Sequence, residues 1–554
     1  MVDLLTTLAI IFIVAGPFLL VANKFELPTV PLLIVAGLVA GVFIEEELTL
    51  ELAQFGIALL VFSFGVGIQF DTVRTVLLES EVATLGQIVV VGSLGIGTGL
   101  VFGIPLQESL YLGAAAALSS SIVGTALLQE EIRNNLIRGR LAESIHFVQD
   151  LIALVLLLVL SAEGFAADPI ATQIGYGMML LVGAVLVNRY LFDLLGRLAG
   201  GSSELMIIGA VSILVVFIGV AEIVGVSIVV GAFAAGLAVR HDRDRYLDLF
   251  NGIESIKDFF IAIFFVTIGA LVAFPTLEKL LLAAGLVVLT AVVKPIVTTV
   301  ILILQGHEAR SATLTSLSID QVSEFALIIA IEALLLGFLT QSVFDAIILA
   351  AAVTMITSSL SQRYDERIYR ALADRGLIVG RHGKIDAWSS CAEDITDHVI
   401  IIGFGRQGRQ LVQTCKEIGQ RYVVIENEPE LRDTIRMECD EFVFGDAMEK
   451  YTWKKANGEA ARLIVSTVPS DPVSERILDL FYGREVILNA YDVETALELL
   501  DRGALYVIVT DLLAGEQLVQ YVRALIYGSL TPEALREQRR LKLEEQFTTV
   551  ARVS

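Results

Sequence analysis

Long apolar runs recur along the first two thirds of this 554-residue chain and then stop. Up to about residue 363, each run holds roughly 20 apolar residues, which is long enough to cross the hydrocarbon core of a bilayer. Beyond that point the sequence becomes charged and has the alternating pattern of a soluble domain. The pattern therefore predicts an all-α polytopic membrane domain over residues 1–363, followed by a water-soluble part.

We expect about thirteen membrane-spanning helices, near residues 3–22, 27–44, 51–69, 83–104, 108–128, 142–162, 172–194, 203–219, 222–239, 256–273, 279–304, 312–336 and 341–360. Arginines concentrate in the connections 129–140, 188–201 and 240–250, which fall on one side of the membrane under this count. The positive-inside rule then places the C-terminal part in the cytoplasm and the N-terminus outside. The protein is predicted to be a multi-pass protein of the cell membrane.

The composition agrees with a membrane protein and argues against a soluble protein, a nucleic-acid-binding protein and a chain held by zinc or disulfides. Hydrophobic residues make up 55% of the chain, and the mean hydropathy of +0.74 is too high for a soluble protein of this size. The net charge of −23 argues against nucleic acid as a partner. The three cysteines form no C-x-x-C motif, so neither a zinc site nor a disulfide framework is indicated.

An aspartate, Asp150, lies near the centre of the sixth expected span, in the stretch HFVQDLIAL (146–154). His146 and Glu143 lie one and two helical turns earlier on the same face. A hydrogen bond between helices would be a purely structural reason for such a residue. An intramembrane carboxylate, however, usually marks an ion or proton path, because an ionised group is costly in a bilayer.

Two further spans are polar at mid-membrane, ALSSSIVGTA (117–126) and SLSIDQVSEFALII (316–329), and they lie seven spans apart. Serines in membrane helices also occur where helices pack closely or bond to their own backbone. Two interrupted spans at corresponding positions nevertheless favour an inverted-repeat transporter, in which broken helices expose backbone groups to a central ion. The eleventh span contains Lys294, a buried cation for which we expect Asp150 to be the partner.

The soluble part contains a glycine motif in an informative context. Gly403, Gly405 and Gly408 form G-x-G-x-x-G directly after an apolar run and at the start of a helical pattern, and Glu426 ends the next strand-like run. Such glycines let backbone amides approach a pyrophosphate, while the acid meets a ribose hydroxyl. A fold of this type that binds no nucleotide is the alternative.

More strand-like runs follow at 442–447, 461–471, 484–492 and 505–511, which predicts a doubly wound parallel sheet. We expect a linker over 364–396, a Rossmann-like domain over 397–530 and a charged helix over 531–554. No dehydrogenase substrate domain follows the sheet, so a nucleotide would regulate the protein rather than react. We do not expect an enzyme.

The chain resembles the monovalent cation:proton antiporter-2 family, specifically its Kef-type potassium:proton antiporters with a cytosolic RCK (TrkA-N) domain. LSSSIVG (118–124) is similar to the family's L-S-S-T-A pattern, and GRLAESIHFVQD (139–150) to the stretch that ends in its Gln-Asp pair. The other matching stretches are FSFGVGIQFD, GAFAAGLAV, FFVTIGA and QVSEFA in the membrane domain, and GFGRQG and FGDA in the RCK domain.

The resemblance implies an NhaA-like antiporter fold with inverted repeats, and a homodimer in which a core bundle moves against a scaffold in an elevator-type motion. It implies that Asp150 binds the monovalent cation and the proton. The other residues it assigns to this site are Gln149, Ser119, Ser120, Ser121, Lys294, Asp320, Gln321 and Glu324. It also implies a regulatory nucleotide, AMP or NAD(H), held by Gly403, Gly405, Arg406, Gln407, Gly408, Glu426, Asp446 and Ala447.

Two departures from the Kef pattern limit the comparison. Where the family has Q-G-G-E-F-A, this chain has Q-V-S-E-F-A over residues 321–326, so Val322 and Ser323 replace two glycines. Asp320, which precedes this stretch, is an additional acid. The specific basic residues on which glutathione gating of the best-known relatives depends are not identified in this sequence, so glutathione control is not assumed.

Potassium:proton antiport is the favoured hypothesis, with potassium, protons, a nucleotide and a second copy of the chain as partners. Sodium:proton antiport by the same fold is the main alternative. A nucleotide-gated potassium channel is disfavoured, because TQIGYG (172–177) resembles a selectivity filter but no pore helix precedes it. A sensor without transport would not explain why Asp150, Lys294 and two broken polar spans occur together.

Overall fold

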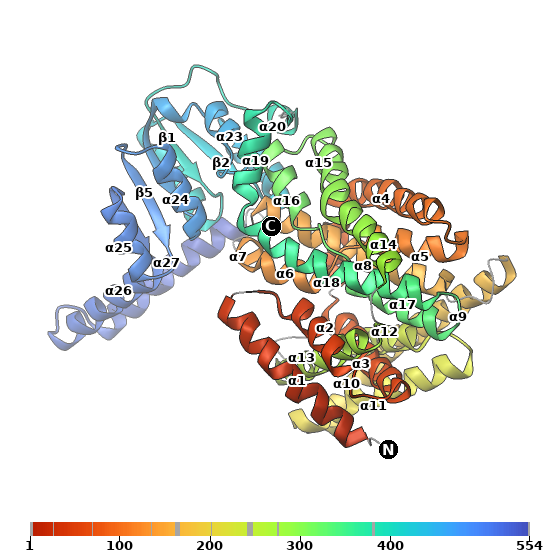
Figure 1. Cartoon of the computed structure of the whole chain (residues 1–554). Helices are drawn as coiled ribbons and strands as arrows, with labels where there is room; N and C mark the ends of the chain where they lie inside the picture. The colour runs from red at the N-terminus through yellow and green to blue at the C-terminus, as the bar shows by residue number, and fades with distance from the viewer. Residues whose placement is uncertain are drawn as a thin grey trace. The chain divides into compact units, whose positions relative to one another are not determined.

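The computed structural model describes residues 4–551 apart from 26, 69, 134–135, 161–166, 201, 241–246, 274–275 and 379–382. The chain forms two compact units, Met1–Arg381 and His382–Ser554. The boundary between the units falls within the segment expected to be a linker (Figure 1).

The regular elements that the structure describes in the first unit are all helices. They are α1 (Leu4–Phe25), α2 (Thr29–Ala40), α3 (Glu46–Gly67), α4 (Phe70–Val101), α5 (Leu106–Ala117), α6 (Ser121–Leu127), α7 (Gln129–Arg133), α8 (Ile137–Leu160), α9 (Ala167–Leu186), η1 (Val187–Leu191), α10 (Phe192–Leu198), α11 (Ser203–Ile223), α12 (Ile228–Ala238), α13 (Leu247–Ala270), α14 (Leu277–Val288), η2 (Leu289–Val293), α15 (Lys294–Leu304), α16 (Ala309–Leu317), α17 (Glu324–Leu335), α18 (Gln341–Arg363) and α19 (Asp365–Asp374). Within the described residues, nine helical segments are long and apolar enough to cross a membrane, by length and composition. Each of the thirteen expected spans overlaps one helix of this unit or two or three consecutive ones.

The two polar spans are broken helices, as the sequence predicts. Helix α5 ends at Ala117 and α6 begins at Ser121, while α16 ends at Leu317 and α17 begins at Glu324. In each case a serine caps the second half-helix: Ser120 Oγ accepts a hydrogen bond from the N–H of Val123 (3.2 Å), and Ser323 Oγ from that of Phe325 (3.0 Å). These caps satisfy N–H groups that would otherwise lack partners in the membrane interior.

Counted as spans, α2 and α3 lie seven spans before α12 and α13, which is the same shift that separates the two broken helices. Helix α2 packs against α13, and the equivalent pair α12 and α3 also packs together. Both contacts are made at glycines. A side chain at Gly37 or Gly269 would overlap the backbone of the other helix, and so would one at Gly65 or Gly236. Small residues allow this close approach of membrane helices.

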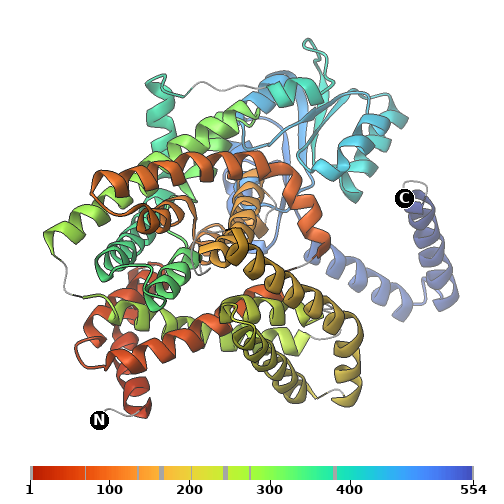
Figure 2. The same ribbon diagram turned by 90° about the vertical axis from the view of Figure 1, so that its right-hand side faces the viewer.

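The helices of the first unit fall into two groups that pack mainly among themselves. One group contains α1, α2, α3 and α9–α13, and the other contains α4–α8 and α14–α18. In the second group the long helix α4 (orange) lies beside α15 (light green) in both views (Figure 1 and Figure 2).

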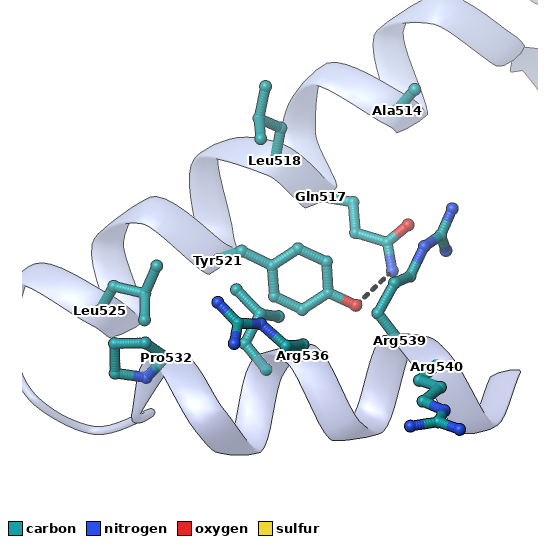
Figure 3. A pocket seen from close by; sticks show the side chains of 10 residues that line it. Ala514, Gln517, Leu518, Tyr521, Leu525, Pro532, Arg536, Arg539 and Arg540 are labelled. Carbon is teal, nitrogen blue, oxygen red and sulfur yellow. Dashed lines mark hydrogen bonds between the residues drawn. The ribbon is translucent and has the colours of Figure 1, made fainter. Parts of the chain in front are cut away.

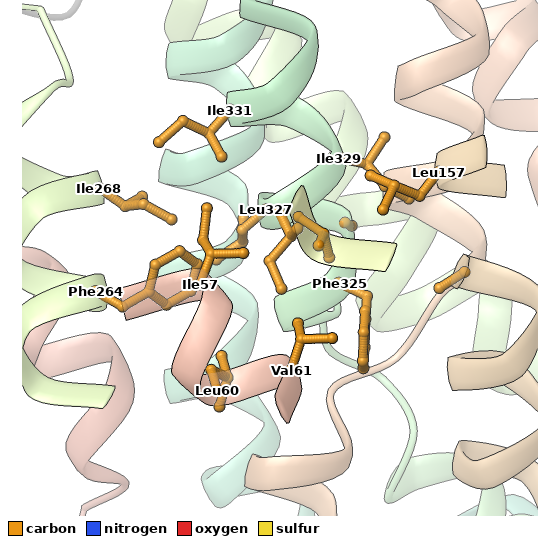
Figure 4. Packing of buried hydrophobic residues seen from close by; sticks show 14 of the residues in the cluster. Ile57, Leu60, Val61, Leu157, Phe264, Ile268, Phe325, Leu327, Ile329 and Ile331 are labelled. Atoms are coloured by element: carbon orange, nitrogen blue, oxygen red, sulfur yellow. The ribbon is translucent and has the colours of Figure 1, made fainter. Parts of the chain in front are cut away.

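A buried apolar cluster includes residues from both groups (Figure 4). Ile57 and Val61 of α3 and Phe264 of α13 lie near Phe325 and Leu327 of α17. Because lipid tails are as apolar as these side chains, close packing rather than exclusion of water favours their association.

The second unit contains a six-stranded parallel sheet in the order β3-β2-β1-β4-β5-β6, which confirms the predicted doubly wound fold. Its strands are β1 (His398–Ile402), β2 (Tyr422–Glu426), β3 (Phe442–Phe444), β4 (Ala461–Ser466), β5 (Val486–Ala490) and β6 (Tyr506–Val509). Its helices are α20 (Gly383–Trp388), α21 (Arg406–Ile418), η3 (Pro429–Leu431), α22 (Arg432–Glu438), α23 (Lys450–Lys455), η4 (Gly458–Ala460), α24 (Asp471–Leu480), α25 (Val493–Asp501), α26 (Thr510–Ile526) and α27 (Pro532–Ala551). The strands are mostly apolar because helices cover both faces of a parallel sheet.

The two last helices extend away from the sheet and enclose a groove of about 1100 Å³ (Figure 3). Apolar side chains such as Leu518 and Leu525 of α26 and Leu535 of α27 line it, with Arg536 and Arg539 at its edge. None of the residues of α26 is buried.

Candidate functional site

Lys294 connects the two broken helices. Pro295, which follows it, has no N–H to continue an α-helical pattern, and the π-helical turn η2 precedes the lysine. The side chain of Lys294 is fully buried, and its Nζ donates to the carbonyl oxygens of Leu118 (3.0 Å) and Gln321 (2.8 Å). Both carbonyls lie in the breaks, where no helical N–H reaches them. The lysine thus satisfies one backbone acceptor from each broken helix.

Glu324 and the serines form a second connection between the breaks. Glu324 Oε1 accepts from Ser121 Oγ (2.6 Å) and from the N–H of Ile122 (3.1 Å), at the start of α6. A carboxylate is favourable there because a helix N-terminus carries partial positive charge. Ser119 Oγ donates in turn to the carbonyl of Ile319 (2.8 Å). Hydrogen bonds therefore join the two broken helices from both sides: a carboxylate of the second accepts from the first, and a hydroxyl of the first donates to the second.

Gln149 holds the first break against two neighbouring helices. Its Oε1 accepts from the N–H of Ser119 (2.8 Å), and its Nε2 donates to Oε1 of Gln87 in α4 (2.8 Å). Gln87 then donates to the carbonyl of Ala117 (2.8 Å), the last residue of α5. Gln87 was not predicted from the sequence to belong to the site. An amide within the apolar run of the fourth span was the available signal.

The side chain of Asp150 has no hydrogen-bond partner, unlike Gln149 and Lys294, which hold the breaks. It is 1% exposed, and neither carboxylate oxygen has a hydrogen-bond partner among the described residues. The expected ion pair with Lys294 is therefore wrong: the ammonium binds two backbone carbonyls instead, because the breaks leave those acceptors free. The carboxylate of Glu324 lies close enough to repel that of Asp150. Its Oε2 atom also lacks a hydrogen-bond partner among the described residues.

Asp320 and Gln321 face α18. Asp320 Oδ2 accepts from Ser361 Oγ (2.6 Å), while Oδ1 has no partner among the described residues. Gln321 Nε2 donates to the carbonyl of Ser120 (3.1 Å), and its Oε1 accepts from Ser358 (3.1 Å). The two serines of α18 were also missed from the sequence. Gln321 belongs to the crossing of the broken helices, and Asp320 adds a buried acid at its edge.

The arrangement provides oxygen ligands for a hard cation. Free carboxylate oxygens of Asp150 and Glu324 lie where the breaks expose backbone, and such oxygens suit an unhydrated alkali cation or a proton. In the part of the chain that the structure describes, no group of three or more histidine, cysteine, aspartate or glutamate side chains is placed to hold a metal ion.

The glycine motif of the second unit lies between β1 and α21. Gly403 has a φ of +88°, and an added Cβ would lie 2.7 Å from Oγ1 of Thr467. A Cβ on Gly408 would overlap the carbonyl oxygen of Gly403. Gly405 is different: its φ of −71° suits any residue, and nothing lies within 4 Å of an added Cβ. The fold alone therefore explains the first and third glycines but not the second.

Glu426 closes the turn from the end of β2. Its Oε2 accepts from the N–H of Phe404 (2.6 Å), and its Oε1 from the N–H groups of Asn427 (2.7 Å) and Glu428 (3.0 Å). The carboxylate is thus next to the glycine turn, where a ribose would lie in a dinucleotide fold. Arg406 and Gln407 are exposed at the start of α21.

Asp446 and Ala447 follow β3 and make local contacts. Asp446 Oδ1 accepts from the N–H of Met448 (2.9 Å), and the carbonyl of Ala447 accepts from the indole N–H of Trp453 (2.7 Å). They lie after the carboxyl end of a strand next to β2, the edge at which ligands bind in such sheets.

Comparison with known proteins assigns both units. The family described as "Sodium/hydrogen exchanger, transmembrane" matches residues 8–362. The chain belongs to this family. The TrkA-N domain matches residues 399–510, so the antiporter is of the Kef type of the monovalent cation:proton antiporter-2 family. It is a multi-pass membrane protein that exchanges cations for protons and carries a TrkA-N domain.

Individual proteins are similar to the antiporter over most of its length. YbaL of Escherichia coli strain K12, named as a candidate cation/proton antiporter, is 26% identical over 537 residues, which cover 91% of this chain and 95% of YbaL. The glutathione-regulated potassium-efflux system protein KefC of Salmonella schwarzengrund is 26% identical over 517 residues, covering 87% and 79%. The solved sodium proton antiporter MjNhaP1 of Methanocaldococcus jannaschii is 18% identical with a TM-score of 0.48, covering 65% of this chain and 99% of that one.

Proposed function

We propose that the antiporter exchanges potassium for protons and that Asp150 holds either the cation or the proton, never both. The observation that carries this proposal is the unpartnered carboxylate: Gln149 and Ser121 are engaged in holding the breaks, whereas both oxygens of Asp150 are free. An ionised group that deep in the membrane is costly without a counter-charge. Only the loaded forms would then cross, which couples the two fluxes.

Potassium is favoured by Gln149 and Asp150, because this pair of one neutral and one acidic residue matches the Gln-Asp pair of the Kef-type potassium:proton antiporters. The similar protein KefC is named a potassium-efflux protein, which supports the same ion. Sodium is the second candidate. It is favoured by Asp320, a buried acid with one free oxygen at the edge of the crossing.

An elevator-type motion is supported by the two groups of helices. The crossing, α8 and the lysine of α15 all belong to the group α4–α8 and α14–α18, so the whole site can move as one body. The glycine contacts at Gly37–Gly269 and Gly65–Gly236 lie within the other group, which would serve as the scaffold.

A nucleotide, AMP or NAD(H), is proposed to regulate transport from the second unit. Gly405 supports this, since neither its backbone nor its surroundings require a glycine, whereas a phosphate approaching the backbone would. The amides at the start of α21 and the carboxylate of Glu426 would bind the phosphate and the ribose. We assign no enzymatic turnover to this unit.

We further propose that the antiporter is a homodimer, with the second unit in the cytoplasm and the N-terminus outside. Helix α26 supports the dimer, because Leu518, Val519, Val522 and Ile526 are all largely exposed along it. A second copy covering this face would bury them. Val522→Glu is expected to yield monomers in light scattering, whereas Tyr482→Glu, at an exposed position elsewhere in the unit, is not.

The exchange proposal is tested in proteoliposomes with a trapped pH dye and alternating potassium and sodium gradients. We expect a proton flux driven by potassium, lost in Asp150→Asn and retained in Glu51→Gln, a change at an exposed acid of the same unit. A flux driven only by sodium would reassign the ion. Exchange retained in a folded Asp150→Asn variant would refute the role of Asp150.

A further inference from the structure

His146 is a buried histidine that the site described above does not use. Its side chain is 2% exposed, and neither ring nitrogen has a hydrogen-bond partner among the described residues. Buried polar atoms are nearly always hydrogen-bonded, so an unpartnered imidazole in a membrane helix needs an explanation. A ring that must exchange protons rather than hold a fixed bond would have this property.

The position of His146 on α8 lies between an exposed acid and the buried site. Asp150 lies one turn further along the helix and is buried, while Glu143 lies about one turn earlier and is exposed. Residues three or four apart on a helix have Cβ atoms about 5–6 Å apart and lie on the same face. Glu143, His146 and Asp150 therefore form a row that runs from an exposed carboxylate to a buried one.

The ring lies directly against the first broken helix. A Cβ on Gly124 of α6 would overlap Cε1 of His146 and lie 2.6 Å from Nε2 and 3.2 Å from Nδ1. Helix α6 contains no titratable side chain, so its backbone forms an uncharged wall for the ring. Of the charged groups on neighbouring helices, Lys294 of α15 acts on the imidazole electrostatically. Glu324 of α17 acts on Asp150 in the same way.

We propose that His146 relays protons between the exposed side of α8 at Glu143 and the carrier Asp150. This inference depends on the proposed function, because it presupposes that Asp150 takes up a proton. A neutral imidazole has one N–H and one bare nitrogen. The bare nitrogen accepts a proton from Glu143 or from water, and the other nitrogen gives its proton to the carboxylate of Asp150. One proton moves inward, no electrons are transferred, and rotation of the ring restores the first tautomer. When a cation arrives at Asp150, the proton leaves by the same steps in reverse.

Chemical rescue tests the relay in proteoliposomes. His146→Ala removes the ring and leaves a space beside Gly124, and it should lower the maximal proton flux roughly 100-fold, the lower end of what a positioned proton-transfer group contributes. The potassium concentration for half-maximal rate should not change. Added imidazole should restore a large part of the flux, because it can occupy the space and carry the proton. His146→Gln keeps the size of the side chain and should be equally slow.

Matched variants separate a relay from a packing role. Leu157→Ala makes a cavity in the same helix at another buried position, and imidazole should have no effect on it. Wild-type flux in His146→Gln would overturn the relay, and so would a slow, folded His146→Ala variant that imidazole does not rescue. Exchange that persists in Asp150→Asn would instead refute the proposed function, whatever the histidine variants do.

Discussion

Gly405 and Gly408 should respond differently to replacement by alanine. At Gly408 the new Cβ would meet the backbone carbonyl of Gly403, which cannot rotate away. Overpacking of this kind costs about 1–3 kcal/mol. At Gly405 the space is open, and the residue is the N-cap of α21 with an ordinary φ. Alanine there gains about 0.4–1 kcal/mol by restricting the unfolded chain. It loses about the same amount because alanine is a poor N-cap.

The free energy of unfolding should therefore fall in Gly408→Ala and stay nearly constant in Gly405→Ala. Nucleotide binding should weaken in both, by about tenfold or more in Gly405→Ala, which corresponds to about 1.4 kcal/mol. Both tryptophans of the chain, Trp388 and Trp453, lie in the second unit, so their fluorescence reports the unfolding of that unit within the intact protein.

Calorimetric titration of the full-length antiporter with AMP and with NAD measures the binding. A Gly405→Ala variant that unfolds like the wild type and binds both nucleotides with unchanged affinity would refute the reasoning. The second glycine would then have no ligand to explain it.

Three further predictions concern an ion pair of the first unit, the sheet and the carrier. Asp365 of α19 forms an ion pair with Arg138 of α8 at 2.6 Å, and both side chains are mostly buried. Asp365→Asn is expected to lower the free energy of unfolding of the first unit by an amount between the ~1 kcal/mol of an exposed pair and the ~3–5 kcal/mol of a buried one. Arg370→Gln, which breaks an exposed pair of the same helix, should leave that free energy nearly unchanged, and equal losses in the two variants would contradict this. Burial lowers the pKa of His398, so the stability it contributes is present above its unfolded pKa of about 6.5 and is lost as the pH falls. Tryptophan fluorescence should show a lower unfolding temperature at pH 5 than at pH 7, and a smaller difference in His398→Gln; an equal difference would contradict this. Gln149→Asp adds a second carboxylate to the carrier, so exchange should become sensitive to membrane voltage, and voltage-independent flux in the folded variant would show that no additional charge crosses.

The broken helices and Asp150 could be predicted because their signals are local. A run of serines or an acid within an apolar span is visible without knowing what packs against it. The glycine motif was predictable for the same reason, since strand, turn and helix follow each other within thirty residues or so of the pattern.

The partner of Lys294 could not be predicted, because it depends on acceptors that only the folded breaks create. From sequence the ammonium needs a carboxylate, yet two carbonyls without helical N–H groups satisfy it instead. Gln87 and Ser361 were missed for a related reason. Each bonds to a residue more than forty positions away or on another helix, and a single polar residue in an apolar span gives no indication of its partner.

The central claim is that a cation and a proton compete for Asp150, and proton release on cation binding tests it most directly. Purified antiporter in detergent, in buffers of different ionisation enthalpy and across a pH series, would be titrated with potassium and with sodium by calorimetry. We expect about one proton to leave for each cation bound where Asp150 is protonated, and both heats to vanish in Asp150→Asn. Cation binding without proton release in the wild type, or proton release that persists in Asp150→Asn, would contradict it.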